Sequence, residues 1–187
     1  MLPDLFPDLL DVVFVSINPS TYSVEQGHYF ARRSNKFWTC ISRSTLTLTM
    51  RTDLGAVQLG PEHDVLLPRY GIGFTDLVKR ATPRASDVTP AEFAAGVNVL
   101  LEKIHRLRPR VACFQGMTAY QYVHRALGGA ARSAALGLQP ARLGRTAVFV
   151  VPNPSGANAH FSRAEQTAWY DQLAELRDRR KHAVAPR

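Results

Sequence analysis

The sequence contains two asparagine-proline pairs whose residue types and positions could contribute to catalysis or binding. They lie in Asn18-Pro19-Ser20 and Asn153-Pro154-Ser155. A single pair of this kind most often forms a turn, because asparagine hydrogen-bonds to nearby backbone and proline fixes φ. Here each pair comes directly after a short apolar run typical of a buried strand. We therefore interpret both segments as candidate site loops, with simple turns as the alternative.

A third candidate segment runs from Gly71 to Asp76, where Gly71 and Gly73 could let the backbone approach a ligand closely. A dinucleotide-binding glycine motif is excluded, because Asp76 stands where the third glycine would be. The chain also has no phosphate-binding Gly-x-x-x-x-Gly-Lys sequence. This segment could share one pocket with the two asparagine-proline loops.

Residues that could bind a metal are sparse. The six histidines form no His-x-x-x-His pair, and no His-x-Glu occurs with Pro-Cys-x-x-Cys, so zinc hydrolysis and zinc-dependent base deamination lack their ligands. Cys40 and Cys113 are too few for a disulfide framework or a cysteine-rich metal site, and we expect both to be reduced core residues. His28 and His160 flank the candidate loops and are as consistent with loop surface as with substrate contact. The sequence predicts neither a metal nor a cofactor.

The elements that must position these loops begin with three almost continuous apolar runs, at residues 11–17, 110–114 and 147–151. Such runs predict strands that are covered on both faces. The first and third run straight into the two asparagine-proline loops. Because ligands of open parallel sheets bind beyond the carboxyl ends of the strands, the candidate residues fall where a site is expected.

Helices are predicted between and after these strands. A capping box at residues 89–92 begins one helix, which Pro109 prevents from continuing, and a second box at 162–165 begins a C-terminal helix. Residues 37–47 could form another helix. The fold class predicted is α/β, a three-layer α/β/α arrangement around a central, mostly parallel sheet. Two polar, irregular stretches receive no assignment: 20–36 and 51–70.

The length of 187 residues predicts one domain, 1–187, with a core of about 11–176 and a basic C-terminal end, 177–187, that we expect to be a frayed helix end. A net charge of +8 and a pI near 10.0 favour a polyanionic partner, although charge alone is weak support. No apolar run approaches a membrane span, and the first ten residues do not resemble a secretory signal, so we expect a soluble intracellular protein.

Several motifs, in order, resemble the mismatch-specific uracil-DNA and thymine-DNA glycosylases of the uracil-DNA glycosylase superfamily. The resemblance covers roughly residues 11–176, and several motifs in order are more specific than any one of them. Residues 137–140 add a match closer to the thymine-DNA type. The other matching segments are 17–20, 27–30, 35–38, 70–78 and 153–156.

This resemblance implies a monofunctional enzyme of base excision repair. It would flip uracil, with thymine and ethenocytosine as further candidates, out of mismatched or damaged double-stranded DNA and hydrolyse the N-glycosidic bond. Single-stranded DNA is a further candidate substrate. The resemblance also implies a cytoplasmic monomer, associated with the nucleoid in a bacterium.

Site roles follow from the same resemblance. Asn18 would hold the attacking water, which its amide can orient but not deprotonate. Backbone N–H groups near Ile17 and Ser20, with the Ser23 hydroxyl, would contact the base. Tyr29 and Phe30 would bind the flipped base, with the ring of Phe30 stacked on it.

Asp76 departs from the family pattern, because relatives generally carry asparagine or lysine there. A carboxylate could activate the water as general base or stabilise the sugar cation. The alternative is an exposed loop aspartate or a helix cap. Lyase activity is not expected, because the catalytic motifs contain no lysine, and Lys79 is the nearest candidate.

The loop at residues 153–160 also departs from the family pattern. The resemblance assigns DNA contact to Asn153, Ser155 and Gly156, but where relatives carry leucine or arginine as an intercalating wedge this chain has the small Ala157. Asn158 or His160 could replace the wedge. This departure puts discrimination for the opposite guanine in doubt.

Two other function classes remain open. One is a binding module of the same fold that recognises mismatched or single-stranded DNA without cutting the glycosidic bond. Asn18 and the added carboxylate argue against it. The other is an unrelated α/β hydrolase of nucleosides or small esters, for which the chain lacks a Gly-x-Ser-x-Gly nucleophile elbow.

Overall fold

The structure, a computed structural model, describes residues 1–130 and 134–182. The strands are β1 (Val12–Ser16), β2 (Ile72–Asp76), β3 (Val111–Gln115), β4 (Gly137–Leu143) and β5 (Thr146–Val151). The α-helices are α1 (Thr21–Gln26), α2 (Phe37–Arg43), α3 (Leu48–Leu54), α4 (Pro90–Leu107), α5 (Met117–Ala126) and α6 (Arg163–His182). The short 3₁₀ helices are η1 (Thr45–Thr47), η2 (Pro61–His63), η3 (Leu67–Tyr70) and η4 (Ala85–Asp87).

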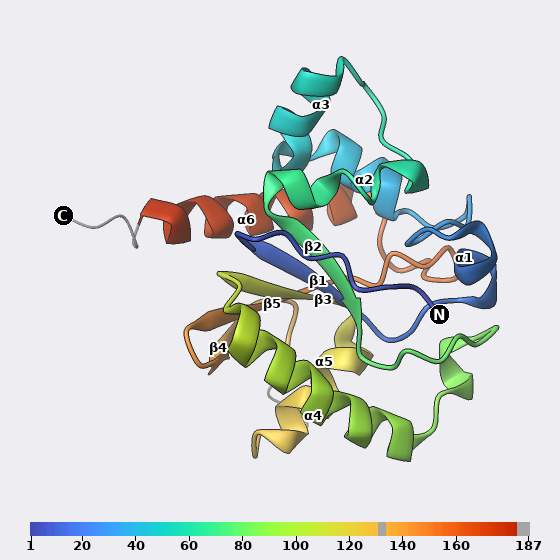
Figure 1. The fold of residues 1–187 in the computed structure, drawn as a ribbon, viewed down its shortest axis with the longest axis vertical. Helices are drawn as coiled ribbons and strands as arrows, with labels where there is room; N and C mark the ends of the chain where they lie inside the picture. The colour runs from blue at the N-terminus through green and yellow to red at the C-terminus, as the bar shows by residue number, and fades with distance from the viewer. Residues whose placement is uncertain (131–133, 183–187) are drawn as a thin grey trace.

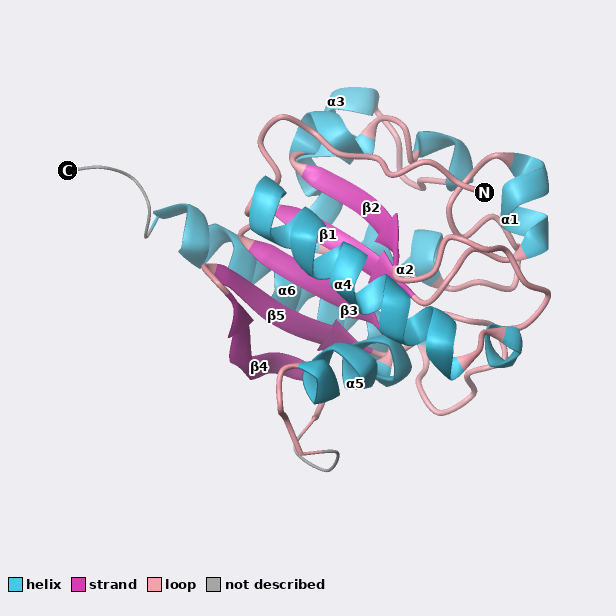
Figure 2. Ribbon diagram, turned by 60° about the horizontal axis from the view of Figure 1, so that its bottom comes forward, coloured by secondary structure: helices cyan, strands magenta, loops and turns pink. Residues whose placement is uncertain are grey.

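One five-stranded sheet with the order β2-β1-β3-β5-β4 forms the centre of the molecule. Neighbouring strands are parallel except β4, which pairs antiparallel with β5 at the edge. Helices α4 and α5 cover one face of the sheet, and α2 and α6 cover the other (Figures 1 and 2). The predicted three-layer α/β/α fold is confirmed. No helix in the described ranges combines the length and apolar character needed to cross a membrane.

The three predicted strands correspond to β1, β3 and β5 within about one residue at each end. Both capping boxes form, with Thr89 and Glu92 at the start of α4 and with Ser162 and Glu165 exchanging hydrogen bonds at the start of α6. Two strands were not predicted. Residues 72–76, interpreted as a loop, form β2, and residues 137–140, assigned above to a family motif, form the first half of β4 at the far edge of the sheet.

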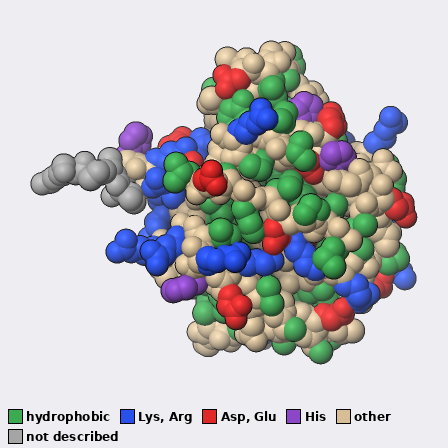
Figure 3. Space-filling model, in the orientation of Figure 1, with side chains coloured by type: hydrophobic (Ala, Val, Ile, Leu, Met, Phe, Trp, Pro, Cys, Tyr) green, Lys and Arg blue, Asp and Glu red, His purple; other side chains and the backbone are tan. Residues whose placement is uncertain are grey.

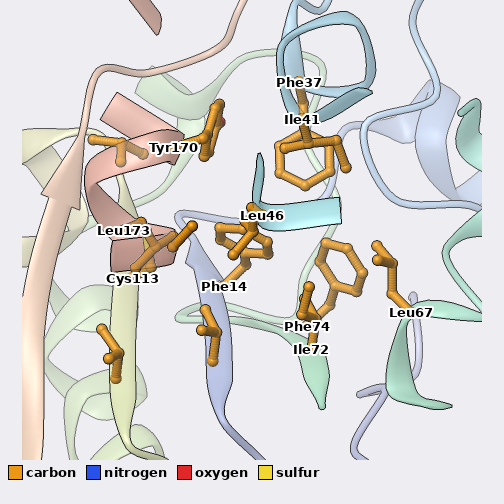
Figure 4. Packing of buried hydrophobic residues seen from close by; sticks show 14 of the residues in the cluster. Phe14, Phe37, Ile41, Leu46, Leu67, Ile72, Phe74, Cys113, Tyr170 and Leu173 are labelled. Atoms are coloured by element: carbon orange, nitrogen blue, oxygen red, sulfur yellow. The ribbon is translucent and has the colours of Figure 1, made fainter. Parts of the chain in front are cut away.

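The core beneath α2 and α6 is rich in aromatic rings (Figure 4). Phe14 of β1 contacts Phe37 edge-on at 5.2 Å between centroids and Tyr170 at 6.0 Å. Truncating one such buried ring to alanine typically costs about 3–5 kcal/mol. Cys40 and Cys113 are buried free thiols in this layer, so their prediction as core residues is confirmed.

The glycines of the 71–76 segment serve packing rather than ligand approach, which corrects our interpretation. Gly71 has a φ of 75°, and a Cβ there would lie 2.6 Å from Asp11 Oδ2. A Cβ on Gly73 would lie 2.6 Å from the carbonyl oxygen of Leu5, which pairs with Phe74 through two backbone hydrogen bonds. The N-terminal segment therefore covers the edge of β2, and the glycines make room for it.

The basic C-terminal end is an ordered helix as far as it is described, not the frayed end that we expected. Helix α6 continues to His182. Arg177 Nη1 donates to the carbonyl of Leu46, Arg180 Nη2 donates to that of Arg145, and Lys181 pairs with Asp11. These contacts hold α6 against the body of the protein. The rest of the predicted end, 183–187, lies outside the described residues.

Candidate active site

A cavity of about 460 Å³ opens at the carboxyl ends of β1, β2 and β3. Its walls come from segments far apart in the chain, including the loop after β1, the segment after β2 and the loop after β5. The predicted site residues that line it are Ile17, Asn18, Ser20, Ser23, Tyr29, Phe30, Asp76, Asn153, Ser155, Gly156 and Ala157. The fold thus gathers the asparagine-proline loops and Asp76 around one space.

Asn18 is oriented by the segment that follows β2. Its Nδ2 donates to Thr82 Oγ1 at 2.7 Å and to the carbonyl of Arg80 at 3.0 Å. The Thr82 hydroxyl gives its own proton to the carbonyl of Arg84, so it can only accept from Asn18. Beside it, the carbonyl of Ile17 accepts from Val78 N, which anchors the loop to the end of β2. With both amide protons used, Asn18 has Oδ1 left as an acceptor for a molecule in the cavity.

Asp76 is the last residue of β2, and only 3% of it is exposed. Its Oδ2 lies 3.2 Å from the Tyr29 hydroxyl and 3.4 Å from Lys79 Nζ. Burial raises the pKa of Asp76 to about 6, although Lys79 and Tyr29 act in the opposite direction. The exposed loop aspartate that we kept as an alternative is excluded, because Asp76 is a buried strand-end residue of the cavity.

The floor of the cavity carries three polar side chains from neighbouring strand ends. Side chains alternate along a strand, and Ser16, Asp76 and Gln115 each come two residues after a residue of the aromatic core layer. All three therefore face that layer. Asp76 Oδ1, Ser16 Oγ and Gln115 Nε2 are buried and have no hydrogen-bond partner in the described part of the chain. Such unsatisfied atoms are rare in proteins, and here all three belong to residues that line the cavity.

Two serines connect the start of α1 to the aromatic wall. Ser20 is the N-cap of α1, and its Oγ accepts from Ser23 N at 3.1 Å. The buried Ser23 Oγ lies 3.1 Å from Ser20 Oγ and accepts from Ala31 N at 3.3 Å. Both serines thus help to position the turn that carries Tyr29 and Phe30.

The two aromatic residues of this turn differ in burial. Tyr29 is buried and stacks on Phe74 with centroids 4.9 Å apart. Phe30 is half-buried, stacks on Phe37 at 4.3 Å and has a φ of 54°, a conformation uncommon for a non-glycine residue. Phe30 is therefore both a core contact and part of the cavity wall.

The loop after β5 is held by its own polar groups. Asn153 Oδ1 accepts from Ser155 N, and Asn158 bonds to the carbonyl of Asn153 and to His160 N. Lys36 Nζ donates to the carbonyl of Asn158 at 2.7 Å. Neither Asn158 nor His160 is among the residues that line the cavity. Both polar ends of Asn158 serve the loop, so in this conformation it does not project as a wedge.

The tip of this loop packs closely against the segment before α2. A Cβ on Gly156 would lie 2.6 Å from the carbonyl oxygen of Ser34, so the close approach requires glycine. Ala157 follows at the mouth of the cavity and is exposed. The position at which the resemblance predicts a wedge is thus exposed to solvent and carries only a methyl group.

Lys79 lies behind Asp76 rather than in the cavity. Its Nζ pairs with Asp4 and with Asp76, and Asp4 also pairs with Lys103 at 2.7 Å. Lys79 is not among the residues that line the cavity. In the ranges 1–130 and 134–182, no three His, Cys, Asp or Glu side chains are arranged to hold a metal ion.

Several cavity residues were not predicted from the sequence. Leu2, Ser16, Thr82, Arg84 and Gln115 all line the cavity. Ser16 and Gln115 could have been found, because each ends an apolar run with a polar residue at the carboxyl end of a strand. Leu2 and Thr82 carry no such local signal, since their placement depends on contacts with distant segments.

The sequence model of the family described as "Uracil DNA glycosylase superfamily" matches residues 3–177. Among solved structures, this chain is similar to the solution NMR structure of a "putative Uracil DNA glycosylase" from Methanosarcina acetivorans. The TM-score is 0.56 and the identity 20%, and the match covers 94% of this chain and 96% of the other. At 20% identity the structural likeness supports the fold alone, and the match to the family's sequence model supports membership of that family.

Proposed function

The chain belongs to the uracil DNA glycosylase superfamily, and from this premise we propose that it is a monofunctional, mismatch-directed DNA glycosylase that removes uracil. Thymine and ethenocytosine are the further candidate bases. The observation that carries the proposal is the placement of Asn18 and Asp76 around one cavity, each with an acceptor oxygen that the described residues leave free.

Hydrolysis of the N-glycosidic bond requires a water on one side of the sugar and an anionic base leaving on the other. In the proposed reaction Asn18 Oδ1 accepts a hydrogen bond from the water and orients its oxygen toward C1′. The new C–O bond forms as the C–N bond breaks, the base departs with the bonding electron pair, and Asp76 takes the proton of the water. An ionised Asp76 also stabilises the cationic sugar.

The departing base would be held by the loop after β1 and by Phe30. Backbone N–H groups near Ile17 and Ser20 are the proposed donors to its developing charge, and Phe30 is the proposed stacking surface. Base stacking on an aromatic ring contributes about 1–3 kcal/mol. This gain offsets part of the cost of extruding the nucleotide, which is lower for a mispaired base.

The mouth of the cavity would face the DNA. Arg32 and Arg84 both line it and are exposed, so each can reach a phosphate. Ser155 and Gly156 are proposed to contact the DNA backbone through main-chain N–H groups. Because Ala157 is small and Asn158 is used within the loop, we propose a weak wedge and modest discrimination for the opposite guanine.

A base-release assay tests this function. Duplexes with a single G·U pair are incubated with excess protein, and alkaline cleavage then reports abasic sites. We expect release by the wild-type protein, and losses of at least about tenfold in Asn18→Ala and in Asp76→Asn, as is usual for groups acting in the transition state. Tight binding of the duplex without release would show instead a non-catalytic binding module.

A further inference from the structure

Gln115 ends β3 in the cavity floor and has an amide group whose two ends have different surroundings. Its Oε1 accepts a hydrogen bond from the Tyr170 hydroxyl at 2.9 Å. Its Nε2 is buried, with no partner anywhere in the described ranges. With Oε1 bonded to the Tyr170 hydroxyl, the NH₂ group is the end of the amide that has no partner.

The surroundings of Gln115 favour a ligand as the missing partner. The residue is 3% exposed and lines the cavity, and an unpaired buried amide donor is costly. Gln166 is an instructive contrast: it is also a buried glutamine with unpaired amide atoms, but it lies on α6 and does not line the cavity. Of these two glutamines, Gln115 is the one that a substrate in the cavity could reach, and its NH₂ group is held in a fixed orientation.

We propose that Gln115 is a specificity-determining residue, whose Nε2 donates a hydrogen bond to a carbonyl oxygen of the extruded base. This inference rests on the proposed glycosylase function. Uracil and thymine present carbonyl oxygens at C2 and C4, whereas cytosine shares the C2 carbonyl but has an amino group at C4. A fixed donor that meets the C4 position therefore favours uracil and thymine over cytosine. Tyr170, which holds the other end of the amide, acts as a positioning residue.

The test replaces either partner of the proposed hydrogen bond. Single-turnover excision is measured on duplexes carrying uracil, 2-thiouracil or 4-thiouracil opposite guanine, since each thio analogue exchanges one carbonyl oxygen for a poor acceptor. The proteins are the wild type, Gln115→Met, and Gln166→Met as the matched control. Comparing the uracil-to-thiouracil rate ratio between proteins cancels the intrinsic reactivity of each base.

We expect Gln115→Met to excise uracil about tenfold more slowly, the effect of losing one hydrogen bond to a buried donor. For 4-thiouracil, the uracil-to-thiouracil ratio should be at least about fivefold smaller in Gln115→Met than in the wild type. Gln166→Met should keep the wild-type ratios. A change confined to 2-thiouracil would overturn the role in specificity, because cytosine shares the C2 carbonyl.

Equal ratios in wild type and Gln115→Met, for both analogues, would overturn the inference even if the variant were slower overall. Should Gln115→Met fail to fold, Tyr170→Phe serves as the second variant. It leaves Gln115 in place but frees its amide, and the same ratio must shrink if the inference holds. If the wild-type protein releases no uracil, both the proposed function and this inference are wrong. That outcome is distinct from an active enzyme whose uracil-to-thiouracil ratios are the same with and without Gln115.

Discussion

At the scale of single residues, Asp76 has an ionisation that falls within the working pH range of an enzyme. Burial raises its pKa to about 6. If Asp76 acts in its ionised form, excision should slow about tenfold per pH unit below pH 6 and level off above it. Single-turnover rates between pH 4.5 and 8.5 measure this profile.

Two variants make the profile specific to Asp76. Asp76→Asn should lose the decrease in rate below pH 6, which is the acid limb of the profile. It should keep only a low, pH-independent rate, because its side chain does not titrate. Asn18→Ala should be slower at every pH but keep the limb. An acid limb that survives unchanged in Asp76→Asn would assign the ionisation to another group.

The same burial predicts an effect on stability. The pKa of Asp76 rises from 3.8 unfolded to about 6 folded, so both states are protonated only when the pH is well below 3.8. As the pH rises, the unfolded chain releases the proton first, and the folded protein is progressively destabilised until about pH 6. A shift of about two units corresponds to about 3 kcal/mol. Asp76→Asn should therefore raise Tm relative to wild type by roughly 5–10 °C at pH 7.5 and by much less at pH 4, as measured by thermal unfolding.

Asp4 provides a control of opposite sign. Burial tends to raise its pKa, but bonds to Lys103 and Lys79 outweigh burial and lower it. Its carboxylate thus stabilises the fold above its unfolded pKa, and this stability is lost as the pH falls. Asp4→Asn should lower Tm at pH 7.5. If both variants shifted Tm in the same direction with pH, the burial argument for Asp76 would be wrong.

At the scale of elements, the segment from Arg80 to Arg84 holds the loop that carries Asn18 in place. Its backbone exchanges hydrogen bonds with the loop, from Thr82 N to Pro19 O and from Thr21 N to Thr82 O, and its Thr82 hydroxyl accepts from Asn18. Thr82→Val preserves shape and backbone bonds but removes one of the two acceptors that hold the Asn18 amide. We expect a five- to tenfold slower excision, about 1 kcal/mol, with an unchanged circular dichroism spectrum.

Thr82→Ser is the matched variant, since it restores the hydroxyl on a smaller side chain. Its excision rate should return to within about twofold of wild type if the hydroxyl alone matters. A Thr82→Val protein that is as active as wild type would show that Asn18 is oriented by Arg80 alone, or that its orientation does not limit the rate.

Some elements of the fold could be predicted from the sequence, and others could not. β1, β3 and β5 were predictable because strands buried on both faces are continuous apolar runs, and the site loops were predictable because they follow such strands. β2 was missed because Gly71 and Gly73 weaken its pattern, and those glycines are required by the N-terminal segment packed against them. The contact of Asp76 with Tyr29 and that of Asn18 with Thr82 join residues 47 and 64 apart in sequence. No local pattern records such contacts.

At the scale of the whole molecule, the excess of positive charge is present at both ends of the sheet. Arg32 and Arg84 are exposed at the cavity. At the opposite end, Arg142 of β4 and Arg145 of the β4–β5 turn lie near Arg180 of α6. Burial, together with the charges of Arg142 and Arg110, lowers the pKa of Arg180. Figure 3 shows Lys and Arg side chains gathered where α6 ends. Net charge alone therefore does not identify the face that binds DNA.

The dependence of binding on salt can identify that face. Each arginine that contacts a phosphate adds about 0.9 to the slope of log affinity against log salt concentration. If the cavity end binds DNA, Arg32→Gln with Arg84→Gln should reduce the slope by about 2, whereas Arg142→Gln with Arg145→Gln, which removes the same charge, should change it by less than about 0.5. Fluorescence anisotropy of a labelled G·U duplex between about 50 and 200 mM salt measures both slopes. Equal reductions in the two double variants would mean that DNA is attracted by the charge of the whole molecule. Recognition of the target base would then depend only on its extrusion and on its fit in the cavity.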